Sequence, residues 1–309
     1  MRATRLRRTA TVLLTAALGA LPACSAAPAP DRPTAPPTTS SGPAPDTVHR
    51  VALRGAVNVR DLGGYRTRDG HHVRYGRVFR ADGLGKLTPA DGAKLTGLGL
   101  RTVVDLRVPA EIARDGADRL PRGLEPVSRP VPDRRLNDTT NEALGSKDPD
   151  TQRKLLGGGR AERLMRATYR SFVTDAQSRR QFAATLRDLA DGRGAPLLFH
   201  CTAGKDRTGW LSYVLLRAVG VPEATATRDY LLSNDLRAAA DRRTRAGLKE
   251  SGRMREPDLL TPLLAVREDY LQAAVDRARQ DYGGLDGYLT EGLGLDSRTL
   301  ARLRSRLVH

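Results

Sequence analysis

The chain has few of the residues on which several common protein architectures depend. Only two of its 309 residues are cysteine, Cys24 and Cys201, so the sequence excludes a scaffold held together by several disulfides. The five histidines are His49, His71, His72, His200 and His309. Their spacing matches no metal-binding motif, so we expect neither a metal site nor a cofactor.

Lysine and aromatic residues are also scarce. Six of the 52 basic residues are lysine, and aromatic residues make up 4% of the chain. The formal net charge of +17 is of the sign that attracts nucleic acid or anionic membranes. However, no basic stretch carries interleaved aromatic side chains. We therefore attribute the charge to a compositional preference for arginine and expect no nucleic-acid partner.

Two common catalytic motifs are missing. No Gly-x-Ser-x-Gly sequence is present, which argues against a serine hydrolase of the α/β class. Gly204-Lys205 is followed by Asp206 rather than serine or threonine, which excludes a nucleotide-binding P-loop.

The first 47 residues indicate export rather than folding. Met1–Ala23 has arginines followed by the apolar run Thr11–Leu21, which is shorter than the roughly 20 residues that span a bilayer. Leu21–Cys24 resembles the lipobox of bacterial lipoproteins, although Pro22 is unusual there. We expect lipidation of Cys24 and anchoring on the outer face of the cell membrane, with plain secretion as the alternative. Residues 24–47 are rich in proline, alanine and threonine and are expected to form a disordered tether.

From residue 48 to residue 309 we expect one catalytic domain of the α/β class, because strand-like and helical segments alternate. The predicted strands are Val51–Arg60, Val73–Arg80, Arg101–Leu106, Glu125–Val131 and Pro196–Phe199. The predicted helices are Pro89–Leu98, Pro109–Arg114, Ala161–Val173, Ser178–Ala190, Trp210–Val219, Glu223–Asn234, Leu236–Glu250, Thr261–Tyr282, Leu285–Glu291 and Ser297–Val308. The polar stretch Pro132–Gly159 is expected to be a long loop, and the half after Pro196 to be rich in helices.

The stretch His200–Gly209 carries the chemistry. It joins a predicted strand to a predicted helix, and five residues separate Cys201 from Arg207. Backbone N–H groups at such a helix N-terminus favour an anion and, together with the guanidinium, favour thiolate over thiol. Arg207 can bind two phosphate oxygens at once. The alternative is a buried structural cysteine, but the flanking residues favour a nucleophile that attacks phosphorus without a metal.

His200–Gly209 resembles the signature of cysteine-dependent protein tyrosine phosphatases, and its Gly204–Arg207 version resembles the atypical bacterial group of secreted mycobacterial tyrosine phosphatase B-like enzymes. Further segments that fit this family are Asn58–Tyr65, Phe79–Asp82, Val104–Arg107 with Glu111, Asp229–Asn234 and Tyr282–Tyr288. The resemblance implies a central, mostly parallel sheet flanked by helices, with a possible helical lid at about residues 133–175. It also implies a phosphatase of phosphotyrosine, with dual specificity or phosphoinositide activity possible.

The resemblance also implies roles for individual residues. Cys201 would be the nucleophile, Arg207 the phosphate ligand and Asp206 the general acid, with Asp133 and Asp105 as alternative acids. His200 would support the loop. The remaining phosphate-binding residues would be Thr202, Ala203, Gly204, Lys205, Thr208 and Gly209. The alternatives are a dedicated inositol-phosphate or phosphoinositide phosphatase, or an inactive phosphate-binding module.

Overall fold

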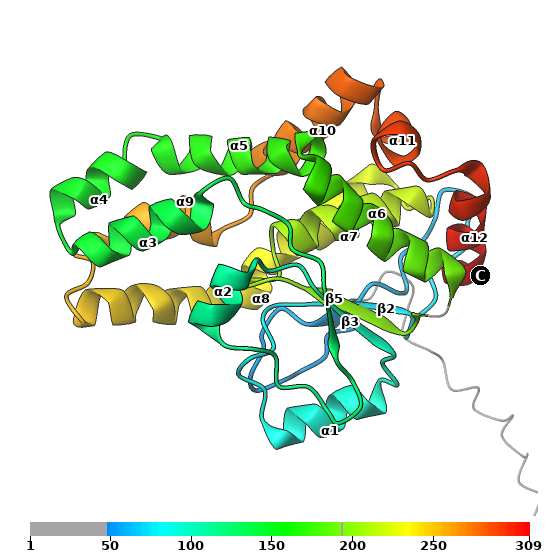
Figure 1. Cartoon of the computed structure of the whole chain (residues 1–309), viewed down its shortest axis with the longest axis horizontal. Coiled ribbons are helices and arrows are strands. Elements are labelled where there is room, and N and C mark those ends of the chain that lie inside the picture. Colours follow the sequence, from blue (N-terminus) through cyan, green and yellow to red (C-terminus); the bar gives the residue numbers. More distant parts are fainter. Residues whose placement is uncertain (1–47, 193) are drawn as a thin grey trace, which may run out of the picture. The chain divides into compact units, whose positions relative to one another are not determined.

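The computed structural model describes residues 48–192 and 194–309 (Figure 1). Its five strands are β1 Arg60–Asp61, β2 Val78–Ala81, β3 Thr102–Asp105, β4 Pro126–Ser128 and β5 Leu197–His200. They form one sheet in the order β1-β2-β5-β3-β4, in which only the β1–β2 pair is antiparallel. The predicted mostly parallel sheet of an α/β fold is confirmed. The predicted signal and tether, residues 1–23 and 24–47, lie outside the described residues.

Helices make up most of the described chain. Up to the end of β5 they are α1 Pro89–Gly97, α2 Pro109–Asp115, α3 Leu136–Ser146, α4 Pro149–Leu156, α5 Arg160–Thr174 and α6 Ala176–Asp191. After β5 come α7 Arg207–Ala218, α8 Glu223–Glu250, η1 Pro257–Leu260, α9 Thr261–Leu264, α10 Glu268–Tyr282, α11 Leu285–Gly287, η2 Tyr288–Gly292 and α12 Ser297–Leu307. The expected helix-rich C-terminal half is therefore present. No described helix is both long and apolar enough to cross a membrane.

The central strand β5 separates two hydrophobic clusters. Leu197 and Phe199 belong to the larger cluster and Leu198 to the smaller one. Because successive side chains of a strand point to opposite faces, the two clusters lie on opposite sides of the sheet. Helix α1 supplies Leu95 to the smaller cluster, and Figure 1 shows α1 on one side of the strands with α6 and α7 on the other. The first ten residues of α7 are all buried, and this helix packs within the larger hydrophobic cluster.

The predicted strand Val51–Arg60 was wrong for all but its last residue. The backbone N–H groups that a strand would donate to a neighbour are bound instead by two carboxylates. Asp91 accepts from Arg54 and Gly55, and Asp82 accepts from Val57 and Asn58. The carboxylates thus hold this segment in an irregular path past the sheet edge.

The neighbouring prediction of a strand over Val73–Arg80 was too long. Gly76 adopts a left-handed φ of +69°, and the regular strand begins only at Val78. Val73 forms an isolated antiparallel bridge with Val308 near the C-terminus. Asp69 and Gly70 lie in a turn between the two segments, and this turn closes a single bridge between Arg66 and His72 rather than joining two strands.

Three other predictions were wrong in the helical part. The expected loop Pro132–Gly159 contains α3 and α4, and Asp148 caps α4 by accepting from the N–H of Thr151. The expected break near Asn234 is absent, because α8 runs without interruption. The break lies instead within the expected helix Thr261–Tyr282. There the Asn234 side chain binds both the N–H and the carbonyl of Val266, at 2.8 and 2.9 Å.

Candidate active site

The loop between β5 and α7 has the predicted strand–loop–helix form. Cys201 follows β5 directly and is 2% exposed, and Arg207 is the first residue of α7. Gly204 has a φ of +63°, and a Cβ added there would lie 2.3 Å from the carbonyl oxygen of Ala81. Only glycine fits this position, because a side chain would meet both an unfavourable backbone conformation and the β2 backbone.

Donors from other segments hold the loop carbonyls from behind. Asn58 Nδ2 and Arg80 Nη2 donate to the oxygen of Gly204 at 2.9 and 2.8 Å, and Arg237 Nη1 donates to that of Ala203 at 3.1 Å. In the part of the chain that the structure describes, the N–H groups of residues 202–206 have no acceptor. The carbonyls are thus occupied and the N–H groups free, which is the arrangement that binds an anion.

A buried charge cluster fixes the donors themselves. Asp229 of α8 accepts from Arg60 at 2.8 Å, from Arg80 at 2.7 Å and from Tyr65 Oη at 2.9 Å. Burial acts to raise the pKa of Asp229, but the two guanidinium groups outweigh it and lower the pKa to about 2. Residues from three sequence segments that suggested the family therefore meet behind the loop and brace it.

Arg207 is held in place by Glu111 of α2. Its Nη1 and Nη2 donate to the two carboxylate oxygens at 2.6 and 2.5 Å, and Glu111 also accepts from Thr202 Oγ1 at 2.6 Å. Burial acts to raise the pKa of Glu111, but the hydrogen bonds and charge of Arg207 lower it to about 2. The bidentate pair orients the guanidinium beside the loop of residues 201–207, whose free N–H groups form the anion-binding hollow that we call the bowl. Near it, the buried hydroxyl of Thr208 has no hydrogen-bond partner among the described residues.

Replacing Glu111 with glutamine should destabilise the protein by about 3–5 kcal/mol near pH 7, because a buried guanidinium would lose its carboxylate. The pKa of Glu111 falls from 4.5 to about 2 on folding, so the pair stabilises above about pH 4.5 and less as pH falls toward 2. Denaturant unfolding should therefore show a smaller difference between wild type and variant at low pH. The exposed Glu125 supplies the control, Glu125→Gln. A pH-independent difference, or none, would contradict this assignment.

Asp206, the predicted general acid, lies at the end of the loop. Its carboxylate accepts from Tyr169 Oη at 2.9 Å and pairs with Lys205 Nζ at 2.7 Å. Tyr230 Oη donates in turn to Tyr169 Oη at 2.8 Å. The carboxylate is therefore fixed by α5 and α8 beside the nucleophile's loop. The Lys205 side chain is 3% exposed, and its ammonium is paired with Asp206.

The structure separates the two alternative acids. Both oxygens of Asp105 are bound by the Arg107 guanidinium, at 2.8–3.0 Å, so Asp105 serves as a buried ion-pair partner. Asp133 follows β4 and is half-buried. Burial raises the pKa of Asp133 although the charge of Arg207 acts to lower it, and Glu111 adds to the rise. Asp133 is therefore close enough to Arg207 to feel its charge and remains a chemically suitable proton donor.

His200 takes part in a second buried cluster. Its Nε2 lies 2.9 Å from Asp118 Oδ2, and Asp118 also accepts from Arg107 at 2.8 Å. The possible ligand atoms of Asp105, Asp118 and His200 lie within 4.8 Å of one another, which sequence spacing could not reveal. Because the Arg107 guanidinium already bonds both carboxylates, the positive charge that they require is present. The cluster fixes the imidazole beside the start of the loop.

Other predicted site residues occupy varied positions. Gly209 lies in the first turn of α7, where an added Cβ would lie 2.9 Å from the Tyr230 ring, so its small size serves helix packing. The predicted lid region contains the whole of α3, α4 and α5. Sequence reasoning assigned no site role to Asn58, Glu111 or Asp229, although all three lie in the segments that suggested the family. Spacing alone could not show which of them face the loop.

Comparisons with known proteins cover most of the chain. A family model described as the tyrosine phosphatase family matches residues 51–309. A Mycobacterium tuberculosis protein named triple specificity protein phosphatase PtpB is 33% identical over 283 residues, which covers 83% of this chain and 98% of that protein. A Cupriavidus necator protein named as a tyrosine-protein phosphatase is 33% identical over 257 residues, which covers 83% of this chain and 87% of that protein. A tyrosine-protein phosphatase of Nostoc commune is 29% identical over 236 residues, which covers 74% of this chain and 73% of that protein.

Proposed function

The chain belongs to the tyrosine phosphatase family, and on that basis we propose that it hydrolyses phosphate monoesters through a covalent intermediate on Cys201. It is a protein tyrosine phosphatase, as the motif at His200–Gly209 predicted. The observation that carries the proposed mechanism is the loop itself. Within the described chain, the stretch that follows Cys201 offers backbone N–H groups without an acceptor, an oriented Arg207 and a Thr208 hydroxyl without a partner.

The proposed reaction has two steps. The thiolate of Cys201 attacks phosphorus, the S–P bond forms and the P–O bond to the leaving group breaks. Asp206 gives its proton to the leaving oxygen, while Arg207 and the loop N–H groups bind the transferring phosphoryl oxygens. Water then attacks phosphorus and returns a proton to Asp206, the S–P bond breaks and the thiolate is restored.

We further propose that the substrates extend beyond phosphotyrosine. The printed name of the Mycobacterium tuberculosis relative describes triple specificity, which supports testing other phosphate monoesters. Lys205 also lies in the loop, but its buried ammonium pairs with Asp206, so phosphoinositides belong to the panel because of the relative's printed name and not because of this charge.

The substrate panel that tests this proposal should be run with a chelator present. We expect turnover of a chromogenic aryl phosphate and of phosphotyrosine peptide that the chelator does not reduce, because no proposed step uses a metal. Phosphoserine peptide and mono- and bis-phosphorylated inositol lipids complete the panel. Activity on phosphotyrosine alone would reject the wider specificity, and loss of all turnover on chelation would reject the mechanism. Phosphate binding without any turnover would favour an inactive binding module.

Localisation is a separate proposal, which the N-terminal sequence supports. We propose that the enzyme is exported and anchored through a lipid on Cys24, with residues 24–47 as a tether. Fractionation of the native host followed by mass spectrometry should find a lipid-modified cysteine at the mature N-terminus in the membrane fraction. An unmodified N-terminus downstream of Cys24, found in the culture medium, would replace the anchor with plain secretion. Cys24→Ser removes the sulfur that would carry the lipid, so this variant should no longer be anchored in the membrane by that lipid.

A further inference from the structure

A strongly basic cavity adjoins the catalytic loop. It has a volume of about 750 Å³ and is lined by Thr202, the residue after Cys201. Its lining contains six basic side chains and two carboxylates. These side chains come from the segment before β1, from the connection between β2 and α1, from the residues just after β3, and from α2 and α8. The basic residues are Arg54, Lys86, Arg107, Arg114, Arg237 and Arg243.

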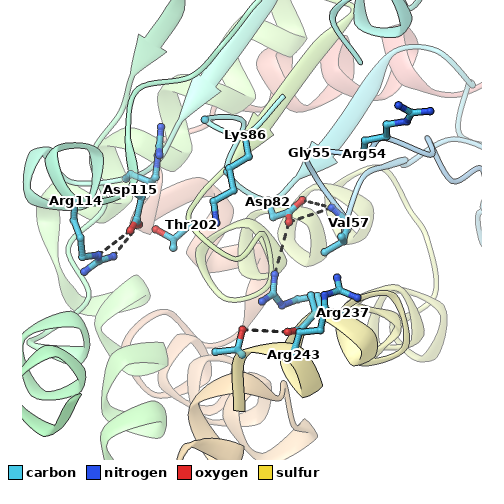
Figure 2. A pocket seen from close by; sticks show the side chains of 15 residues that line it. Arg54, Gly55, Val57, Asp82, Lys86, Arg114, Asp115, Thr202, Arg237 and Arg243 are labelled. Atoms are coloured by element: carbon cyan, nitrogen blue, oxygen red, sulfur yellow. Dashed lines mark hydrogen bonds and ion pairs between the residues drawn. The ribbon is translucent and has the colours of Figure 1, made fainter. Parts of the chain in front are cut away.

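Three of these cations have no acidic partner. The side chains of Arg54, Lys86 and Arg243 make no hydrogen bond or ion pair with any described residue, and all three are exposed. The others are paired, as Arg114 is with Asp115 and Arg237 with Asp241. In Figure 2, Arg54 and Arg114 lie on opposite sides of the cavity, Lys86 extends between them, and Arg237 and Arg243 rise from α8. Unpaired positive charge therefore faces the cavity from several directions.

The cavity offers little to an apolar group. Among the described residues, Val57 and Ala240 are the aliphatic side chains that line it, and none of the described aromatic rings does so. The lining glycines Gly55, Gly83 and Gly85 add no side chain to the cavity, and the N–H groups of Gly55 and Gly83 are already bonded to Asp91 and to the carbonyl of Thr202. A site with several cations and few apolar contacts suits phosphate groups better than an aromatic or aliphatic side chain.

We propose that this cavity binds a second phosphate group on a peptide substrate whose first phosphate lies in the loop at Cys201. This inference rests on the proposed phosphatase function, and it names the class of substrate as doubly phosphorylated peptides. Side chains two residues apart on an extended peptide point to the same side, about 7 Å apart. A second phosphate two residues from the phosphotyrosine can therefore enter the cavity beside Thr202.

Arg237 connects the cavity to the loop. Its Nη1 donates to the carbonyl of Ala203 at 3.1 Å, and the same side chain lines the cavity. A phosphate bound in the cavity thus lies next to a guanidinium that holds the loop. Free charge at Arg54, Lys86 and Arg243 remains available for the phosphate itself, so binding does not require Arg237 to release the loop.

The test compares peptides that differ only in a second phosphate. One phosphotyrosine peptide is made without a further phosphate and with phosphoserine one, two or three residues away. For wild type, we expect kcat/KM to be roughly tenfold higher for the peptide with a spacing of two residues, the effect of a few solvent-screened charge contacts. The preference should shrink as salt is added.

A double variant, Arg54→Ala with Arg243→Ala, should reduce that preference to about twofold or less. The preference is a ratio within one variant, so a general loss of activity cancels. The matched control is Arg180→Ala with Arg298→Ala, which removes the same charge from exposed positions on α6 and α12 and should retain the wild-type ratio. Binding of the same peptides to Cys201→Ser protein gives a second readout that needs no turnover.

Each other outcome has a distinct meaning. A ratio near one in an active wild-type enzyme overturns the subsite and leaves the proposed function intact. A ratio that survives in the cavity variant also overturns it. Absence of turnover on every peptide and on aryl phosphate means that the proposed function has failed first. A soluble inositol polyphosphate can also be added as a competitor of the peptide substrate. If it inhibits wild type but not the cavity variant, and the peptides with a second phosphate are not preferred, the cavity binds an inositol headgroup and the peptide assignment is wrong.

Discussion

Replacing Cys201 with serine is expected to reduce kcat on an aryl phosphate by on the order of 10⁴-fold or more. The proposed first step forms an S–P bond, and a serine hydroxyl at neutral pH is a far weaker nucleophile than a thiolate. Steady-state assays at saturating substrate measure this loss. Because the loop N–H groups, Arg207 and Thr208 remain in place, the variant should still bind phosphotyrosine peptide with an affinity close to that of wild type.

The control must separate lost chemistry from lost structure. Cys201 is buried at the end of β5, so the exchange of sulfur for oxygen could also disturb packing there. Thermal unfolding of wild type and variant, and titration with phosphotyrosine peptide, show whether the bowl survives. A variant that folds, binds peptide and still keeps more than a tenth of the rate would exclude Cys201 as the nucleophile.

The loop could be predicted because its chemistry lies in one contiguous stretch. An apolar run, a short loop and a second apolar run specify β5, the bowl and α7 with little help from elsewhere. The capping box at Thr88 likewise predicts the start of α1, since its two hydrogen bonds with Asp91 are local. Features of this kind depend on residues a few positions apart, which is the range over which sequence patterns are informative.

The parts that could not be predicted depend on distant partners. The segment before β1 has the composition of a strand, but Asp82 and Asp91 take its N–H groups. The break before α10 follows from the Asn234 side chain, 32 residues away in the sequence. Glu111 carries no sign in the sequence that it faces Arg207, 96 residues later. Each case is decided by groups that only the folded chain brings together, and local sequence patterns do not reveal such distant partners.

Two carboxylates, those of Asp206 and Asp133, are candidates for the general acid, and they differ in position and in pKa. Asp206 is fixed in the loop by Tyr169 and Lys205, so its position relative to the nucleophile is set. Asp133 lies on a separate segment after β4, and burial raises its pKa, which helps it to keep a proton at higher pH. The fixed place in the loop argues for Asp206, whereas the raised pKa of Asp133 argues for Asp133. Because Asp206 lies in the same loop as Cys201, we keep it as the proposed general acid.

Asp206→Asn should therefore lose about 10²–10⁴-fold in kcat/KM on an alkyl phosphate, whose leaving oxygen needs a proton, and much less on an activated aryl phosphate. Asp133→Asn is the matched control, and its loss should be similar on both substrates. Tyr169→Phe removes one of the hydrogen bonds that hold Asp206 and should give a weaker version of the same leaving-group dependence. If Asp133→Asn shows the selective loss and Asp206→Asn does not, the proton comes from the segment after β4. The Asp206 carboxylate would then act only through its contacts with Lys205 and Tyr169 at the end of the loop.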